Sequence, residues 1–116
     1  MRDMIEKIVQ SLESEGFVVH VRPQEKVPRG EVVVTLESCP VSAVELRAYQ
    51  VDWTYSVSTV LAEVEEIEQW MVKVLRALEK VETPKLFKVE DTRVVLEGGF
   101  YVVSMKFVVS EMVDVS

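Results

Sequence analysis

Residues 93–109 read RVVLEGGFYVVSMKFVV, and this stretch carries a strong β-hairpin signal. Two runs rich in β-branched and aromatic residues flank Gly98-Gly99, a dipeptide that suits the two-residue turn of a β-hairpin. We expect strands over Arg93–Glu97 and Phe100–Glu111, followed by a tail that frays from Met112. Alternate residues of the second strand share one apolar face, namely Tyr101, Val103, Met105, Phe107 and Val109. The pattern therefore predicts an antiparallel pair with one buried face.

The longest helical pattern lies before this hairpin, from Thr59 to Val81. Its apolar residues recur at spacings of three and four, which lines up one face of a helix. They are Val60, Val64, Ile67, Met71, Val74, Leu78 and Val81, with Trp70 and Leu75 beside them. Ser58 or Thr59 is the predicted N-cap, and Thr83-Pro84 is the predicted stop. At 1.5 Å per residue this helix would be roughly 30–35 Å long, enough to lie across a sheet.

Two extended segments precede this helix in the sequence. Glu31–Glu37 alternates, which predicts a strand that ends at Ser38-Cys39-Pro40. Its inward residues are Val32, Val34 and Leu36, and Val33 is expected on the outward face. Val44–Val57 is the second segment, and its apolar residues change parity between its two halves. One extra residue would restore a single buried face, so we expect a β-bulge or break near Tyr49-Gln50.

The first thirty residues predict one helix and one short strand. Arg2–Glu15 carries an apolar helical stripe, and Gly16 follows it where a C-terminal cap belongs. Phe17–Arg22 is the predicted strand, and Pro23–Gly30 is a loop. A further short strand is expected over Leu86–Glu90.

These elements follow the order α-β-β-β-α-β-β within a single domain, residues 1–116. The fold class expected from that order is α+β, with a mainly antiparallel sheet of about five strands. The long second helix is expected to pack on one face of the sheet.

Composition limits the partners. The chain has 13 basic and 20 acidic residues, for a net charge of −7, which disfavours nucleic acid and anionic membrane surfaces. No apolar run approaches the roughly 20 residues of a membrane span. A lone cysteine, Cys39, indicates a reducing, cytoplasmic setting, and the N-terminus does not resemble a signal peptide. The absence of asparagine leans toward a thermophilic source.

No catalytic constellation, metal site or cofactor site is predicted from the residue pattern. His20, the only histidine, lies mid-strand between two valines, and Cys39 precedes a proline in a turn. The two could act together only if the fold brings them within reach of each other. A cluster of glutamates near the start of the long helix is interpreted as a solvated face, namely Glu63, Glu65, Glu66 and Glu68.

The order and length of the elements resemble the tail-terminator and minor-tail-protein families of long-tailed bacteriophages and prophages. A short helix and hairpin strands precede a long strand, Val44–Val57, that runs into a long helix, and a hairpin with the strand Phe100–Phe107 ends the chain. The resemblance implies a homo-oligomeric ring that ends the tail tube and docks head-completion proteins. Such a ring uses exposed sheet edges and covers apolar residues between subunits. The candidate interface residues are Val33, Trp53, Tyr55 and Val108.

Three functional hypotheses follow from the sequence. The first is this structural assembly protein of the phage or prophage tail. The second is a small ligand-binding or regulatory module of ferredoxin-like character. The third is an enzyme that uses His20 and Cys39, or carboxylates, which would have to lie within about 3 Å of a common point.

Overall fold

A computed structural model describes residues 2–22, 26–81 and 86–115 of the chain. These ranges contain two helices, α1 (Arg2–Ser14) and α2 (Glu65–Glu79). They also contain the strands β1 (Val19–His20), β2 (Val32–Ser38), β3 (Val41–Glu45), β4 (Ala48–Leu61), β5 (Leu86–Glu97) and β6 (Phe100–Asp114). The sheet order is β1-β2-β4-β6-β5, β3 pairs with β4, and every pair except β1 with β2 is antiparallel. The predicted α+β class with a mainly antiparallel sheet is confirmed.

The glycine hairpin forms where the sequence places it. Gly98 and Gly99 have φ angles of 59° and 82°, the two positive values that a type I′ turn requires. Beyond the turn, alternate residues of β6 are buried as predicted, with Val103, Met105, Phe107 and Val109 each at most 2% exposed. β6 also pairs with β4 without interruption, from Ala48 opposite Asp114 to Leu61 opposite Tyr101. β4 and β6 are therefore the central pair of the sheet.

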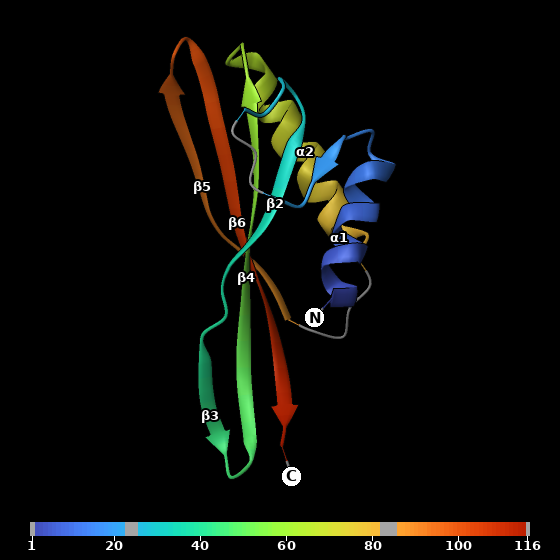
Figure 1. Ribbon diagram of the computed structural model, residues 1–116, viewed down its shortest axis with the longest axis vertical. Coiled ribbons are helices and arrows are strands. Elements are labelled where there is room, and N and C mark those ends of the chain that lie inside the picture. The colour runs from blue at the N-terminus through green and yellow to red at the C-terminus, as the bar shows by residue number, and fades with distance from the viewer. Residues whose placement is uncertain (1, 23–25, 82–85, 116) are drawn as a thin grey trace.

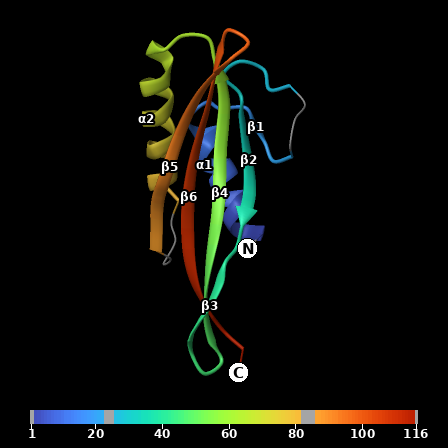
Figure 2. The same ribbon diagram turned by 90° about the vertical axis from the view of Figure 1, so that its left-hand side faces the viewer.

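Both helices lie on the same side of the sheet (Figure 1), and the opposite side carries no helix (Figure 2). The predicted packing of the second helix on one face is thus confirmed. One apolar layer between helices and sheet forms the core, and it draws on α1, α2, β2, β4 and β6. Its buried members are Met4, Ile8, Leu12, Val32, Val34, Tyr55, Val57, Leu61, Trp70, Val74, Ala77, Leu78, Val103, Met105, Phe107 and Val109. Full burial of each large side chain stabilises the fold by about 1.5–3 kcal/mol.

The first helix ends as the sequence predicts. Gly16 has a φ of 94°, its N–H donates to the carbonyl of Glu13, and the N–H of Phe17 donates to the carbonyl of Leu12. These two bonds form the Schellman motif that a glycine favours after the last helical turn. The cap turns the chain back toward the sheet, where Phe17 packs against the core.

The second helix is shorter than predicted, because the strand before it is longer. Ser58 and Thr59 do not cap the helix but belong to β4, which continues to Leu61 opposite β6. Thr59 is buried, and its hydroxyl donates to the Glu31 carbonyl at 2.8 Å. The helix begins at Glu65, where the side chain of Glu66 accepts the N–H of Glu63 at 3.0 Å. The predicted stop at Thr83-Pro84 lies outside the described residues.

The predicted bulge near Tyr49-Gln50 is wrong, and a chain reversal takes its place. The segment predicted as one extended run over Val44–Val57 is two antiparallel strands, β3 and β4, joined by a turn at Leu46-Arg47. Arg47 adopts a φ of 64°, which an L-residue rarely does outside turns. The change of apolar parity therefore reflects a hairpin. The register irregularity lies instead in β3, between Ala43 and Glu45.

The N-terminal strands also differ from expectation. The strand predicted over Phe17–Arg22 is reduced to β1, which pairs in parallel with the start of β2. Val33 lies opposite Ser58 of β4, on the helix-free face where it was expected, yet it is only 7% exposed because β1 and β4 flank it. Leu36 lies opposite Tyr55, on the helix side where it was expected, yet it is 42% exposed, since β1 pairs only with Val32 and Val33 and leaves this end of β2 as a sheet edge.

The C-terminal strands are longer than predicted. The two strands expected over Leu86–Glu90 and Arg93–Glu97 form one, β5, with a register irregularity between Val89 and Asp91. The tail expected to fray from Met112 continues β6 to Asp114. Its last described residue, Val115, donates its N–H to the Arg47 carbonyl at 2.9 Å.

The molecule is elongated, with extents of 52 × 26 × 23 Å. The helices cover only part of the sheet's length, and a three-stranded extension continues beyond them (Figure 1). We call this extension the arm, and it comprises residues 41–52 and 111–115.

Candidate interaction surfaces

The arm has one apolar and one polar side. Directly opposite residues of antiparallel strands share a face, so the register assigns the sides. The β4–β6 register has no shift, which makes the apolar side continuous with the helix-covered face of the sheet. The apolar side carries Val41, Ala43, Tyr49, Val51 and Val113, with the one carboxylate of Glu111 at its root; the other side carries Ser42, Gln50, Asp52, Met112 and Asp114. The core-facing pattern thus continues past the point where helices cover it.

Much of this apolar side is open to solvent. Val41 of the edge strand β3 is 61% exposed and Leu46, at the turn, is 91% exposed, while Val51, directly opposite Val41 on the middle strand β4, is only 8% exposed. Exposure is therefore high on β3 and at the turn, and low on β4 at the root of the arm. Contiguous exposed apolar surface on a soluble protein commonly marks an interaction site.

The root of the arm is held by side-chain hydrogen bonds on both of its sides. On the apolar side, Trp53 Nε1 donates to Glu111 Oε2 at 3.0 Å. On the polar side, Asp52 Oδ1 accepts from Ser110 Oγ at 2.7 Å and from Gln50 Nε2 at 2.9 Å. The bond from Ser110, followed by that from Gln50, lowers the pKa of Asp52 below its ordinary value. Together with the Val115–Arg47 bond at the tip, these contacts give the arm a defined shape.

Tyr55 lies just inside the body from the arm. Its ring stacks on that of Phe107 with centroids 5.5 Å apart. Burial, and secondarily the negative charge of Glu111, raises the pKa of Tyr55 to about 12. The hydroxyl therefore stays neutral at physiological pH, and the residue acts as part of the core.

A second open surface is the outer edge of β5, the last strand in the sheet order. Its first half, up to Asp91, is charged and irregular in register, with Lys88, Glu90 and Asp91. Its second half is apolar on both faces: Val94, Val95 and Leu96 are 48%, 51% and 65% exposed. Charges and bulges are the usual protection of edge strands against pairing. Only the first half of β5 has that protection.

The middle of the helix-free face of the sheet is polar. Thr54 and Ser56 of β4 lie on it beneath an ion pair between Lys106 of β6 and Glu37 of β2, 3.1 Å apart. Because β4 lies between those strands, the ion pair spans it, and the two small side chains are only 7% and 5% exposed. A shallow hollow of about 260 Å³ on this face is lined by Pro40, Asp52, Thr54, Lys88, Glu90, Val108 and Ser110. Its Asp52 carboxylate is already bonded within the chain, as described above.

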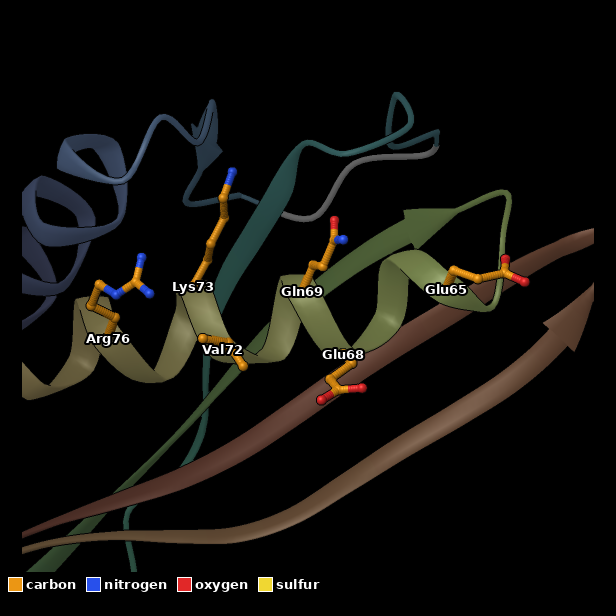
Figure 3. Close-up of a pocket in the computed structure, with 6 residues that line it drawn as sticks. All are labelled: Glu65, Glu68, Gln69, Val72, Lys73 and Arg76. Atoms are coloured by element: carbon orange, nitrogen blue, oxygen red, sulfur yellow. The ribbon is translucent and has the colours of Figure 1, made fainter.

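A further hollow lies on the outer surface of α2 (Figure 3). All of its lining residues come from that one helix: Glu65, Glu68, Gln69, Val72, Lys73 and Arg76. Lys73 and Gln69 point to one side of the helix, and Val72 and Glu68 point to the side of β6 and β5 (Figure 3). Arg76 is engaged with Glu15 of α1 at 3.3 Å. The residues do not converge on a common point, so this hollow offers no enclosed binding site.

The four residues predicted for an oligomer interface fall into two groups. Trp53 and Val108 keep part of their surface exposed, at the root of the arm and on the helix-free face respectively. Tyr55 is fully buried and Val33 is 7% exposed, so neither offers a side chain to a partner while the subunit is folded. Tyr55 belongs to the helix-covered core, and Val33 is enclosed between the neighbouring strands β1 and β4. Sequence reasoning missed the arm and the β5 edge as contact surfaces, and the alternation of Val41 and Ala43 after Pro40 was the available signal for the arm.

The structure separates the residues considered for catalysis. His20 lies beside Val33 at the start of β2, and its Nε2 is 2.7 Å from Glu31 Oε1. Cys39 follows the far end of β2 and is exposed. Six residues of extended chain from Val33 to Cys39 span about 20 Å, so a Cys–His pair is excluded. Among the described residues, no group of three or more His, Cys, Asp or Glu side chains is arranged to hold a metal ion.

No protein-family model matches this sequence, and no curated protein matches it at a significant level. Neither helix in the described ranges is long and apolar enough to cross a membrane.

Proposed function

We propose that this chain is a structural assembly protein that forms a homo-oligomer, with the arm as a contact between copies. The observation that carries the proposal is the uncovered apolar side of the arm. Burying it against a neighbour would contribute about 25 cal/mol for each Å² of apolar area removed from water. The hydrogen bonds at its root fix the shape of this surface before binding, which lowers the entropic cost of association.

Two features shared with the tail-terminator resemblance support a narrower form of the proposal, a ring of the tail-terminator type that ends a phage or prophage tail tube: the long strand β4 leads into α2, and the hairpin of β5 and β6 follows. A ring requires contact between two different surfaces of the subunit. An arm that extends beyond the body suits such a contact, because it can reach onto an adjacent copy. Head-completion and tail-tube proteins would then be the partners of the assembled ring.

Light scattering coupled to size-exclusion chromatography tests the first part. We expect the wild-type chain, at tens of micromolar, to have the mass of several subunits. Replacing Val41 and Leu46 together by serine should lower that mass, because both side chains are exposed and lie on or beside the apolar side. Ser42→Ala, on the polar side of the same strand, is the matched control and should leave the mass unchanged. A strictly monomeric wild type would contradict the proposal.

Electron microscopy of negatively stained protein tests the narrower part. We expect closed rings, and we expect tubes of a tail-tube protein encoded in the same genome to stop growing when the rings are added. Oligomers that are not rings, or tubes that grow unchanged, would remove the tail-terminator role but leave the homo-oligomer standing. Capsid and tail genes beside this gene would support the role independently.

The ligand-binding alternative lacks a specific supporting observation. The two hollows described above are shallow. One is lined by residues of a single helix, and in the other the Asp52 carboxylate is already hydrogen-bonded to Ser110. A small-molecule site usually has a concave apolar pocket with a few convergent polar groups.

A further inference from the structure

The unprotected half of the β5 edge has a self-complementary sequence. Residues 93–97 read Arg-Val-Val-Leu-Glu, with opposite charges at the two ends and three apolar residues between them. Laid antiparallel on a second copy and centred on Val95, the segment places Arg93 opposite Glu97 of that copy. The same register places Val94 opposite Leu96 and Val95 opposite its own counterpart. Each charge thus meets its opposite, and each apolar residue meets an apolar residue.

The faces agree with this register. Arg93, Val95 and Glu97 are opposite Ser104, Val102 and Phe100 of β6, so they lie on the helix-free face. Val94 and Leu96 are opposite Val103 and Tyr101, so they lie on the helix side. Directly paired residues of an antiparallel ladder share a face, and every pair in this register satisfies that condition.

The edge is also physically open. β5 ends the sheet order, and it lies at the outer margin of the sheet (Figure 1). Within the described residues, no backbone hydrogen bond reaches it from any element other than β6. Phe100, 45% exposed and opposite Glu97, adds apolar surface beside Val95 on the helix-free face. Pairing would satisfy the open backbone groups of the edge and bring exposed side chains on both faces into cross-strand contact.

We propose that two copies of this chain associate through antiparallel pairing of residues 93–97, forming a sheet that is continuous across a twofold axis at Val95. The occupant is a second copy because the charges and apolar residues of the segment match the segment itself. A two-fold contact of this kind closes on itself and gives a dimer. It uses a different surface from the arm, and it holds with or without a role in a phage tail.

Charge exchange tests the register. In the Arg93→Glu variant, two glutamates face each other at each end of the ladder. In the Glu97→Arg variant, two arginines face each other at the same places. We expect each single variant to raise the dissociation constant of the dimer at least tenfold in sedimentation-velocity titrations. The double variant Arg93→Glu with Glu97→Arg restores opposite charges and should bring it back within about threefold of wild type. Failure of the double variant to recover, with its melting curve unchanged, would overturn the register.

Disulfide capture tests the twofold axis directly. In a Cys39→Ser background, Val95→Cys brings the two introduced thiols opposite each other, and we expect a covalent dimer under mild oxidation. Asp91→Cys is the control, since the two copies of residue 91 would be about 25 Å apart in this register. If the protein still forms oligomers but Val95→Cys gives no more covalent dimer than Asp91→Cys, this inference is wrong and the arm contact still stands. A chain that is monomeric at every concentration would overturn both proposals.

Discussion

The helix-covered body and the arm are built on the same two strands, yet their apolar faces have different surroundings. In the body, alternate residues of β4 and β6 such as Tyr55, Val57 and Phe107 are fully buried under two helices. In the arm the same faces continue, but Val41 is 61% exposed, and no helix lies over β3 (Figure 1). Alternation along a strand therefore indicates that one face is apolar. It does not indicate whether that face is buried by the same chain or by another molecule.

Truncation in the body should have the largest effect on stability. Phe107→Ala removes a fully buried ring that stacks on Tyr55, and we expect a loss of about 3–5 kcal/mol in the free energy of unfolding. Leu46→Ala at the arm tip should change it by less than about 0.5 kcal/mol for the dissociated chain, because the side chain is 91% exposed. Urea unfolding at low protein concentration measures both. Similar losses for the two variants would contradict the division into body and arm.

Loss of the hydrogen bond at the root of the arm should have a smaller and more local effect. Trp53→Phe keeps most of the apolar ring but removes the N–H that Glu111 accepts, and hydrogen bonds to charged groups contribute about 1.5–3 kcal/mol. We expect amide hydrogen exchange to accelerate in β3 and in the first residues of β4. Amides near Val103 should keep their protection. Faster exchange throughout β6 would mean that arm and body open together.

The two turns give a third comparison. Gly98 needs a positive φ in the body hairpin, so Gly98→Ala should destabilise the chain by about 1–2 kcal/mol. Arg47 holds a φ of 64° in the arm turn despite its side chain, so Arg47→Gly should relieve strain and change stability by less than about 1 kcal/mol. Thermal melts of the two variants measure the contrast. A stabilising Gly98→Ala would be inconsistent with the type I′ turn.

The sequence was most informative where local chemistry and long-range packing agree. Gly98-Gly99, the Gly16 cap and the alternating face of β6 were predicted because each depends on neighbouring residues. The start of α2 was not, because Ser58 and Thr59 suit both a helix cap and a strand, and only pairing with β6 decides between them. The Leu46-Arg47 turn lacks glycine, asparagine and proline, so no local signal marked it.

The interaction surfaces were harder to predict than the fold. Tyr55 and Val33 were proposed for an interface because they are apolar, but their burial depends on helices and strands distant in sequence. The β5 edge was unpredictable for the converse reason. Which strand ends a sheet is a property of the whole topology, and residues 93–97 become a candidate contact only once β5 is known to be outermost.

The smallest predicted effect on stability comes from two carboxylates whose pKa values are lowered. One lies in the helix-covered body and the other in the arm. Glu15 follows the last residue of α1, and its pKa is lowered first by its hydrogen bond with Lys80 at the end of α2 and also by Arg76. The pKa of Asp52, at the root of the arm, is lowered by hydrogen bonds from the neutral donors Ser110 and Gln50. A folded pKa below the unfolded value stabilises the fold above the unfolded value, and that contribution is lost as the pH falls through the folded pKa.

Both groups should therefore contribute to stability above about pH 4.5 and lose that contribution in more acidic solution. Salt should separate them, because screening weakens exposed ion pairs far more than hydrogen bonds from neutral groups. We expect Glu15→Gln to reduce the dependence of the melting temperature on NaCl at pH 7. Asp52→Asn should leave the dependence of the melting temperature on NaCl unchanged, and it should reduce the fall in stability below pH 4. Equal salt responses in the two variants would show that charge, rather than the type of donor, governs both sites.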